Sequence, residues 1–251
     1  GLAGRNGAGI TTLCNILAGL LPPDSGTVEF DRQRLPQFAG SDLPGIGVIH
    51  QQPELAEQLD VTSNILLGHE IVWQGLRGLL AIPNQQKMDE TAVQILTALD
   101  APYIPLREKV HNLSAEHRQL VSIARIMAQP YRLLLIDNPN TLLSIPYQQK
   151  LLQLIRRWQR DDTAILFSSN NLDHLFAVCD RILVLRMGLL VANLRSDETT
   201  REEIVSLLVG LDEPNQRTPA IWALDSYYQA REQAEMLRHN QQLLERDLQA
   251  E

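Results

Sequence analysis

Apolar positions along the chain follow two spacings in turn, and these predict alternating strands and helices. Short continuous apolar runs predict buried strands, most clearly Leu133–Ile136, which ends at Asp137. Apolar residues three and four apart predict amphipathic helices. The predicted strands are Thr27–Phe30, Gly47–Ile49, Leu133–Ile136, Ala164–Ser168 and Arg181–Leu185, and the predicted helices are Thr11–Leu21, Val61–Leu67, Asp89–Leu99, Ser114–Ala128, Tyr147–Gln159 and Leu172–Val178. This alternation predicts an α/β fold, a mostly parallel sheet with helical crossovers.

For one predicted helix, the apolar positions also predict which side is buried. Within Asp89–Leu99, the residues Val93, Leu96 and Leu99 recur at helical spacing. We therefore predict that these three side chains form the buried face of this helix.

The pattern changes after Gly210. Residues 213–219 carry two prolines and few apolar side chains, which is typical of a linker. From Ala220 onward, small or apolar residues recur in alternating steps of three and four, at Ala220, Ala223, Tyr227, Ala230, Ala234, Leu237, Leu244 and Leu248, with Gln241 as the polar member. This heptad pattern predicts a helix over residues 220–251, which either packs back on the globular domain or pairs as a parallel coiled coil.

Composition and charge narrow the class of protein. The 251 residues are 44% hydrophobic, which suits one large or two small globular domains, and 30 acidic against 22 basic side chains give a net charge of −8. No basic surface is expected, so nucleic acid is excluded as a partner. Arg186 interrupts the longest apolar run, which is too short to span a membrane. Cys14 and Cys179 lie far apart in apolar contexts and indicate reduced thiols in a cytoplasmic protein.

A glycine-rich segment from Gly4 to Thr12 reads Gly-Arg-Asn-Gly-Ala-Gly-Ile-Thr-Thr. Glycines at this spacing let backbone N–H groups converge on phosphate oxygens at a helix N-terminus, and a hydroxyl at Thr11 can ligate magnesium. The usual lysine is replaced by Ile10. Taken alone, the segment also fits a tight turn before a helix.

The segments that follow the loop along the chain, in their order, indicate that it is more than a tight turn. They are Leu17–Leu20, Pro23–Gly26, Ile49–Gln52, Asn64–Gly68, Leu113–Gln119, Leu133–Pro139 and Thr200–Gly210. Together with the loop, these segments resemble motifs of ATP-binding cassette (ABC) nucleotide-binding domains, most closely those of sugar importers. The first two resemble the helix and turn after the phosphate-binding loop, the third resembles the Q-loop, and the fourth resembles the segment after it. The last three resemble the signature motif, Walker B and the C-terminal tail. The resemblance covers roughly residues 1–212.

The resemblance implies a fold, ligands and partners. The fold is a P-loop NTPase-like ABC cassette over residues 1–212, with a mostly parallel sheet core and a helical subdomain, followed by the linker 213–219 and the coiled-coil helix 220–251. The ligands are ATP, bound weakly if at all, and Mg²⁺. The implied nucleotide-binding residues are Gly4, Asn6, Gly7, Gly9, Thr11, Thr12, Gln51 and Ser114, and the implied metal ligands are Thr11, Gln51 and Asp137. The implied partners are a second cassette, in a homo- or heterodimer, and either a membrane permease or a fused signalling domain.

Three positions that carry catalysis in the family depart from its pattern. Ile10 stands where a lysine neutralises phosphate charge, and Asn138 stands where a glutamate orients or deprotonates the attacking water. Asn170 stands where a histidine contacts the γ-phosphate, unless the alignment is shifted to His174. No catalytic residue is therefore expected to be intact, and whether the chain hydrolyses ATP stays open.

Two further departures lie in segments that in the family face a partner cassette. Glu116 replaces a glycine of the signature motif, so we expect a negative charge directed against the bound polyanion. Ser144 occupies the position of the D-loop aspartate. The aromatic residue that stacks on adenine would precede Gly1, where the chain begins inside a strand-to-loop transition, and we expect further residues on that side.

Three functions follow as hypotheses. The first is a degenerate ABC-type ATP-binding domain with weak or no hydrolysis, acting as a regulatory, sensory or dimerisation module coupled to a fused output domain. The second is an ATP-hydrolysing subunit of a sugar-type importer, paired with an intact cassette and touching a permease through Glu54–Val61 at the inner face of the plasma membrane. The third is a structural domain that binds no nucleotide.

Overall fold

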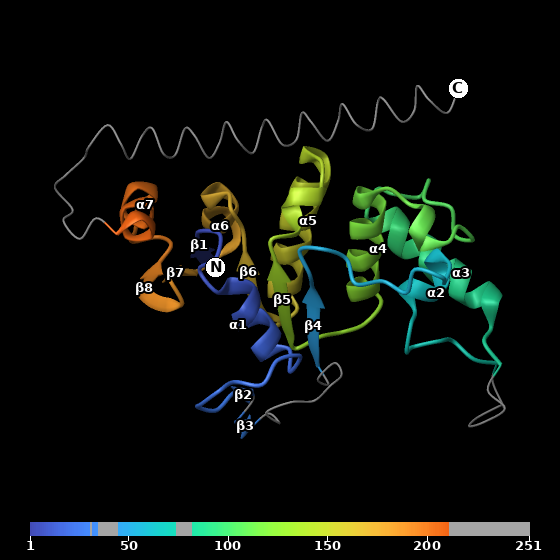
Figure 1. The fold of residues 1–251 in the computed structure, drawn as a ribbon. Coiled ribbons are helices and arrows are strands. Elements are labelled where there is room, and N and C mark those ends of the chain that lie inside the picture. The colour runs from blue at the N-terminus through green and yellow to red at the C-terminus, as the bar shows by residue number, and fades with distance from the viewer. Residues whose placement is uncertain (31, 35–44, 74–81, 211–251) are drawn as a thin grey trace. The chain divides into compact units, whose positions relative to one another are not determined.

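The computed structural model describes residues 1–30, 32–34, 45–73 and 82–210 (Figure 1). The described residues divide into two compact units, the first formed by residues 1–10 and 167–210, and the second by those between residues 11 and 166. The predicted linker 213–219 and heptad helix 220–251 lie outside the described residues.

The described elements follow one another in an α/β alternation. The strands are β1 (Leu2–Gly4), β2 (Glu29–Phe30), β3 (Gln33–Arg34), β4 (Ile46–Ile49), β5 (Leu133–Asp137), β6 (Ala164–Ser168), β7 (Arg181–Arg186) and β8 (Leu189–Arg195). The α-helices are α1 (Ile10–Leu17), α2 (Val61–Ile65), α3 (Gln85–Ala98), α4 (Ala115–Met127), α5 (Ile145–Arg160), α6 (Leu172–Val178) and α7 (Arg201–Val209), with 3₁₀ turns η2 (Val110–Asn112) and η3 (Pro139–Leu142). The predicted alternation is confirmed.

The first unit is built around β1. This strand pairs in parallel with the end of β6 and with β7, and β7 pairs antiparallel with β8. Helices α6 and α7 contact these strands (Figure 1). Leu2, Ile182 and Leu175 are fully buried because strand and helix turn their apolar sides toward one another.

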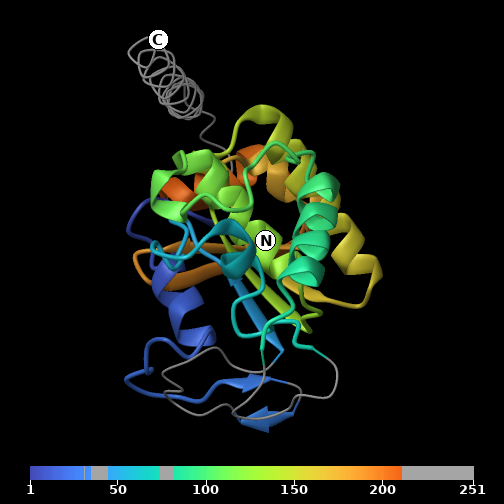
Figure 2. The same cartoon turned by 90° about the vertical axis from the view of Figure 1, so that its right-hand side faces the viewer.

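The second unit combines parallel strands with a group of helices. β4 and β5 pair in parallel, with Ile49 opposite Ile136, and β6 lies beside β5. Leu134, Leu135 and Ile136 are at most 1% exposed, which confirms a strand buried on both faces. Helices α2, α3 and α4 contact one another and form the helical part of this unit (Figure 2). They correspond to the expected helical subdomain.

The buried face of α3 differs from the prediction at one position. Leu96 and Leu99 are each 1% exposed, as predicted, whereas Val93 is 48% exposed and Met88 and Ala92 are buried instead. The helix begins four residues earlier than predicted, because the Asn84 side chain caps it by accepting from the N–H of Lys87. The added turn brings Met88 into the apolar series, and Met88, Ala92 and Leu96 then follow one another at steps of four residues.

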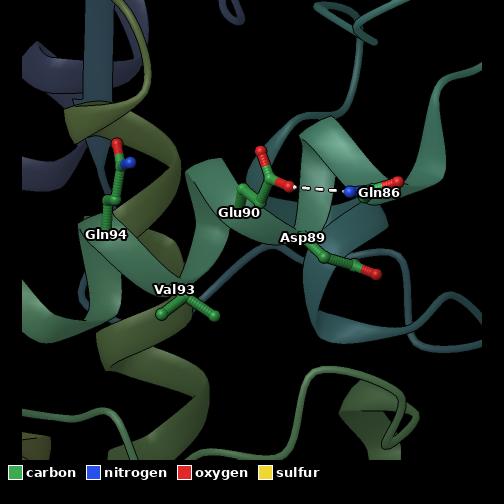
Figure 3. Close-up of a pocket in the computed structure, with 5 residues that line it drawn as sticks. All are labelled: Gln86, Asp89, Glu90, Val93 and Gln94. Carbon is green, nitrogen blue, oxygen red and sulfur yellow. Dashed lines mark hydrogen bonds between the residues drawn. The ribbon is translucent and has the colours of Figure 1, made fainter.

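A hollow lies along the opposite side of α3 (Figure 3). Its lining residues, three and four positions apart on this helix, are Gln86, Asp89, Glu90, Val93 and Gln94. The Gln86 amide donates to the Glu90 carboxylate across one turn. The hollow contains none of the residues that the sequence proposes for nucleotide or metal.

Several elements were not predicted. β1 and β3 are very short, β8 pairs antiparallel at the sheet edge, and α7 spans part of the segment that the sequence identified only by resemblance. α1 is shorter than predicted and ends at Leu17, since Gly19, two residues later, has a φ of 76° in a turn. Short strands and helix ends depend on tertiary pairing more than on local periodicity.

Candidate functional site

The glycine-rich loop of the first unit joins β1 to α1. Gly7 and Gly9 have φ values of 81° and 96°, a region that favours glycine. A β-carbon at Gly4 would lie 2.9 Å from the β-carbon of Ala8 and 2.9 Å from Cδ1 of Ile10. The N–H of Gly188 donates to the carbonyl of Ala8 at 3.1 Å, so the β7–β8 turn supports the loop. The loop is therefore a well-defined turn that requires its glycines.

Ile10 is the first residue of α1. Its side chain reaches back to Gly4, because Cδ1 of Ile10 would lie 2.9 Å from a β-carbon placed on Gly4. The exposed part of the loop is formed by Arg5, Asn6 and Gly7. An isoleucine packed against the strand gives this loop the shape of a phosphate-binding turn without the charge that neutralises phosphate.

The segment after β6 lies at the same edge of the first unit's sheet as the loop. Ser168 is the register partner of Leu2, and parallel strands place their carboxyl ends together. Asn170 is exposed two residues later. His174 lies within α6 instead, with Nδ1 at 3.3 Å from Oγ of Ser169, and burial lowers the pKa of its imidazole. The exposed side chain at the strand end is thus the amide of Asn170.

In the second unit, the Walker B-like and Q-loop-like residues share one sheet edge. Ile49 and Ile136 are register partners, so Gln51 and Asp137 follow adjacent parallel strands. Gln51 is exposed, and Asp137 is 5% exposed. Asn138 is 8% exposed and has a φ of 40°, a left-handed conformation that asparagine tolerates. Its amide can donate or accept a hydrogen bond but offers no carboxylate for general-base chemistry.

Asp137 lies near the helix that carries Thr11. Burial, and secondarily the negative charge of Asp137, raise the pKa of the Cys14 thiol on α1 to about 12. Thr11 lies one turn before Cys14 on the same helix, and both Thr11 and Thr12 are exposed. The structure therefore places the Asp137 carboxylate close enough to α1 for its charge to act on the Cys14 thiol.

These residues fit a magnesium ion held in the way the family resemblance implies. Thr11, Gln51 and Asp137 offer oxygen donors, which Mg²⁺ prefers. Within the described residues there is no group of three His, Cys, Asp or Glu side chains that could hold a metal. One carboxylate suits a Mg²⁺ that takes its other ligands from water and phosphate, rather than a metal held by protein alone.

The raised pKa of Cys14 predicts a pH dependence. The unfolded thiol ionises near its ordinary value of 9.0, whereas the folded thiol stays neutral until about pH 12. A thiol with a raised folded pKa contributes stability that is present below the unfolded pKa and is lost as pH rises through the folded pKa. We expect the free energy of unfolding to fall between these values, with a steeper slope than in Cys14→Ala, as measured by urea unfolding at several pH values. Equal slopes would contradict this assignment.

The signature-like segment begins α4. The Ser114 side chain is the N-cap of this helix and accepts from the N–H of His117 at 3.2 Å. Glu116, expected to direct its charge at a bound polyanion, accepts from the backbone N–H of Ser144 with Oε1 at 2.6 Å. Its carboxylate is therefore engaged within the chain.

Gln119 has a positional role that sequence reasoning missed. Its side chain is fully buried, and Nε2 donates to the carbonyl of His50 at 3.2 Å. Because His50 directly precedes Gln51, α4 fixes the backbone where the Q-loop-like segment begins. A polar residue inside the apolar periodicity of α4 was the available signal.

Asn64 is a second residue whose importance the sequence did not reveal. It is fully buried, accepts from the N–H of Ala56 and donates to the carbonyls of Ala56, Leu59 and Asp60. Arg125 on α4 donates to its side-chain oxygen and to the carbonyl of Glu54. The segment expected to meet a permease, Glu54–Val61, is therefore held to α2 and α4 by hydrogen bonds.

Comparison with known proteins agrees with this geometry. The ABC transporter family profile matches residues 1–141. A ribose import ATP-binding protein of Burkholderia ambifaria is 34% identical over 211 residues, covering 83% of this chain and 40% of its own length, and a xylose import ATP-binding protein of Burkholderia cenocepacia is 33% identical over 214 residues, covering 84% and 40%. The chain belongs to the ABC transporter family, as an ATP-binding domain related to those of sugar importers.

Solved structures show the same fold. A bacterial ABC transporter cassette solved as a dimer superposes with a TM-score of 0.65 at 21% identity, covering 78% of this chain and 84% of that one. The CbiO1 protein of Clostridium perfringens, part of an ABC transporter complex, gives 0.61 at 21%, covering 90% and 86%. The predicted ABC cassette fold is confirmed. Among the described helices, none combines the length and apolar character needed to cross a membrane.

Proposed function

We propose that this chain is an ABC-type ATP-binding domain whose own hydrolytic site is impaired and that it acts as a regulatory or dimerisation partner of a second cassette. The observation that carries the proposal is the packing of Ile10 against Gly4. A packed isoleucine is part of the loop's structure, so the loop keeps its shape without the cation that binding of β- and γ-phosphates uses.

The amides at the two strand ends support the same proposal. Asn138 replaces a carboxylate beside Asp137, and exposed Asn170 replaces an imidazole. General-base assistance contributes roughly 10²–10⁴ in rate, so its loss removes most turnover from a site that still holds nucleotide. Binding of ATP with Mg²⁺ would rest on the loop N–H groups, Thr11, Thr12, Gln51 and Asp137, and binding across a dimer on Ser114. The heptad pattern of residues 220–251 supports parallel pairing of two chains.

A second candidate is supported by the relatives. The ribose and xylose import ATP-binding proteins share about a third of their residues with this chain over 211 and 214 positions, and the chain spans 40% of their length. On this candidate the chain is one cassette of a sugar importer, an intact cassette supplies hydrolysis, and Glu54–Val61 contacts the permease.

The two candidates differ in a measurement on the natural full-length protein. We expect a fluorescent ATP analogue to bind weakly and more tightly with Mg²⁺, and phosphate release to stay at background whether the protein is alone or mixed with a catalytically intact sugar-import cassette. Release above the sum of the two proteins in the mixture would favour the importer candidate. Turnover by the protein alone at the rate of the intact cassette would contradict the proposed impairment.

A further inference from the structure

The contact between Glu116 and Ser144 joins the beginnings of two helices of the second unit. Glu116 lies in the first turn of α4, and Ser144 is the N-cap residue of α5. The N–H of Ser144 donates to Oε1 of Glu116 at 2.6 Å, and the contact is partly buried. The Ser144 hydroxyl makes no capping hydrogen bond to the described residues. The carboxylate therefore places a negative charge and a hydrogen-bond acceptor at the N-terminus of α5, where the helix dipole favours them.

A second connection runs beside the first. Tyr103, in the loop before α4, packs its ring against His117 at 5.4 Å between centroids, and its hydroxyl meets that of Tyr147 on α5. The Tyr147 hydroxyl donates to the carbonyl of Asp100 at 3.3 Å. Lys150 on α5 pairs with the Asp100 carboxylate at 2.6 Å. The first turn of α4, the loop and the first two turns of α5 thus form a continuous set of contacts.

We infer that Glu116 acts as an intrachain clamp, which makes the first turns of α4 and α5 respond to any ligand or partner as one body. A hydrogen bond to an ionised group is stronger than a neutral one, and here it bridges 28 residues of chain. The inference deepens the proposed function and rests on it. It gives the signature-like segment a structural role inside the chain, in place of a contact to a partner's nucleotide.

The clamp has a direct consequence for how the sequence departs from its family. Glycine cannot make this bond, so Glu116→Gly frees the start of α5 instead of restoring a functional signature motif. The two substituted positions, 116 and 144, thereby become partners in a single interaction. Position 144 contributes its backbone N–H, so the bond is lost when the Glu116 carboxylate is removed, or when proline at position 144 removes the N–H, and is kept when only the Ser144 hydroxyl is removed.

The test is hydrogen–deuterium exchange of the natural full-length protein without nucleotide. Glu116→Ala and Ser144→Pro each remove one side of the bond. Proline fits position 144, where φ is −65°, and the preceding Leu143 has φ −102° and ψ 135°, which a residue before proline adopts. We expect peptides covering the first turn of α5 to exchange on the order of tenfold to hundredfold faster in Glu116→Ala, and the first turn of α4 to accelerate in both variants.

Two control variants separate the clamp from general effects. Ser144→Ala keeps the backbone N–H and is expected to exchange like the natural protein. Glu202→Ala removes an exposed first-turn acid of α7, and should leave α4 and α5 unchanged. The double variant Glu116→Ala with Ser144→Pro should exchange no faster in α4 than either single variant, because each single substitution already removes the hydrogen bond between residues 116 and 144.

Unchanged exchange at the start of α5 in a folded Glu116→Ala protein would overturn the clamp. Equal acceleration in Ser144→Ala would overturn it as well, because the hydroxyl would then be the group that matters. If Ser144→Pro does not fold, the comparison of Glu116→Ala with Glu202→Ala still decides. Since no nucleotide is present, the clamp can fail while the proposed impairment holds, and phosphate release can overturn the impairment while the clamp holds.

Discussion

Asn64→Ala is expected to lower the free energy of unfolding by about 4 kcal/mol. The side chain is fully buried and satisfies the N–H of Ala56, three backbone carbonyls and a guanidinium N–H of Arg125. The three carbonyls keep backbone N–H donors, so the loss falls on the Ala56 N–H and the Arg125 guanidinium N–H that Asn64 accepts from. Each buried polar group left without a partner costs about 1–3 kcal/mol. Urea unfolding monitored by circular dichroism measures the change.

Asn112→Ala is the matched control. Asn112 is exposed and its amide contacts the side chain of Glu108 at the surface, so its removal should alter stability by no more than about 0.5 kcal/mol. A loss below about 1 kcal/mol for Asn64→Ala would show that water replaces these hydrogen bonds. The Glu54–Val61 segment would then be less firmly held than the contacts imply.

Restoring three family residues together is expected to produce ATP turnover. We expect Ile10→Lys alone to leave phosphate release at background, because Asn138 still offers no base. Adding Asn138→Glu and Asn170→His should raise release by at least about 10²-fold, the lower end of what general-base catalysis contributes. Steady-state phosphate release with Mg²⁺ and ATP measures this.

The matched control replaces Asn138→Glu with Asn138→Gln in the same background. Glutamine has the length of glutamate without the carboxylate, so release should return to background. Position 138 has a φ of 40°, and either longer side chain is expected to cost about 1 kcal/mol of stability there. Equal turnover of the Glu and Gln variants would show that the carboxylate is not the missing element.

The sequence predicted the alternation of strands and helices because buried parallel strands and amphipathic helices leave strong local patterns. Leu133–Ile136 was placed almost to the residue. On α3 the prediction was right for Leu96 and Leu99 and wrong for Val93, and it began the helix at Asp89 because it overlooked the Asn84 cap. Short elements such as β1 and β8 escaped because pairing with neighbouring strands, rather than their own periodicity, makes them strands.

The candidate site divides in the same way. Identity of the chemical groups at positions 10, 138 and 170 is a property of the sequence, and so is the absence at those positions of a lysine, a glutamate and a histidine. The direction in which a side chain points is not a property of the sequence. Glu116 was expected to repel a polyanion, yet its carboxylate accepts from Ser144, 28 residues away. No local sequence pattern predicts a contact between residues that lie 28 positions apart in the chain.

The sequence by itself therefore determined the family, the order of the elements and the chemical groups at positions 10, 138 and 170, because these depend on residue type and spacing along the chain. The tertiary structure decided that Ile10 packs against Gly4, that Asn64 and Gln119 hold the segments around Gln51, and that Glu116 joins α4 to α5. These contacts form between residues brought together only by folding, where burial makes each polar group depend on a specific partner.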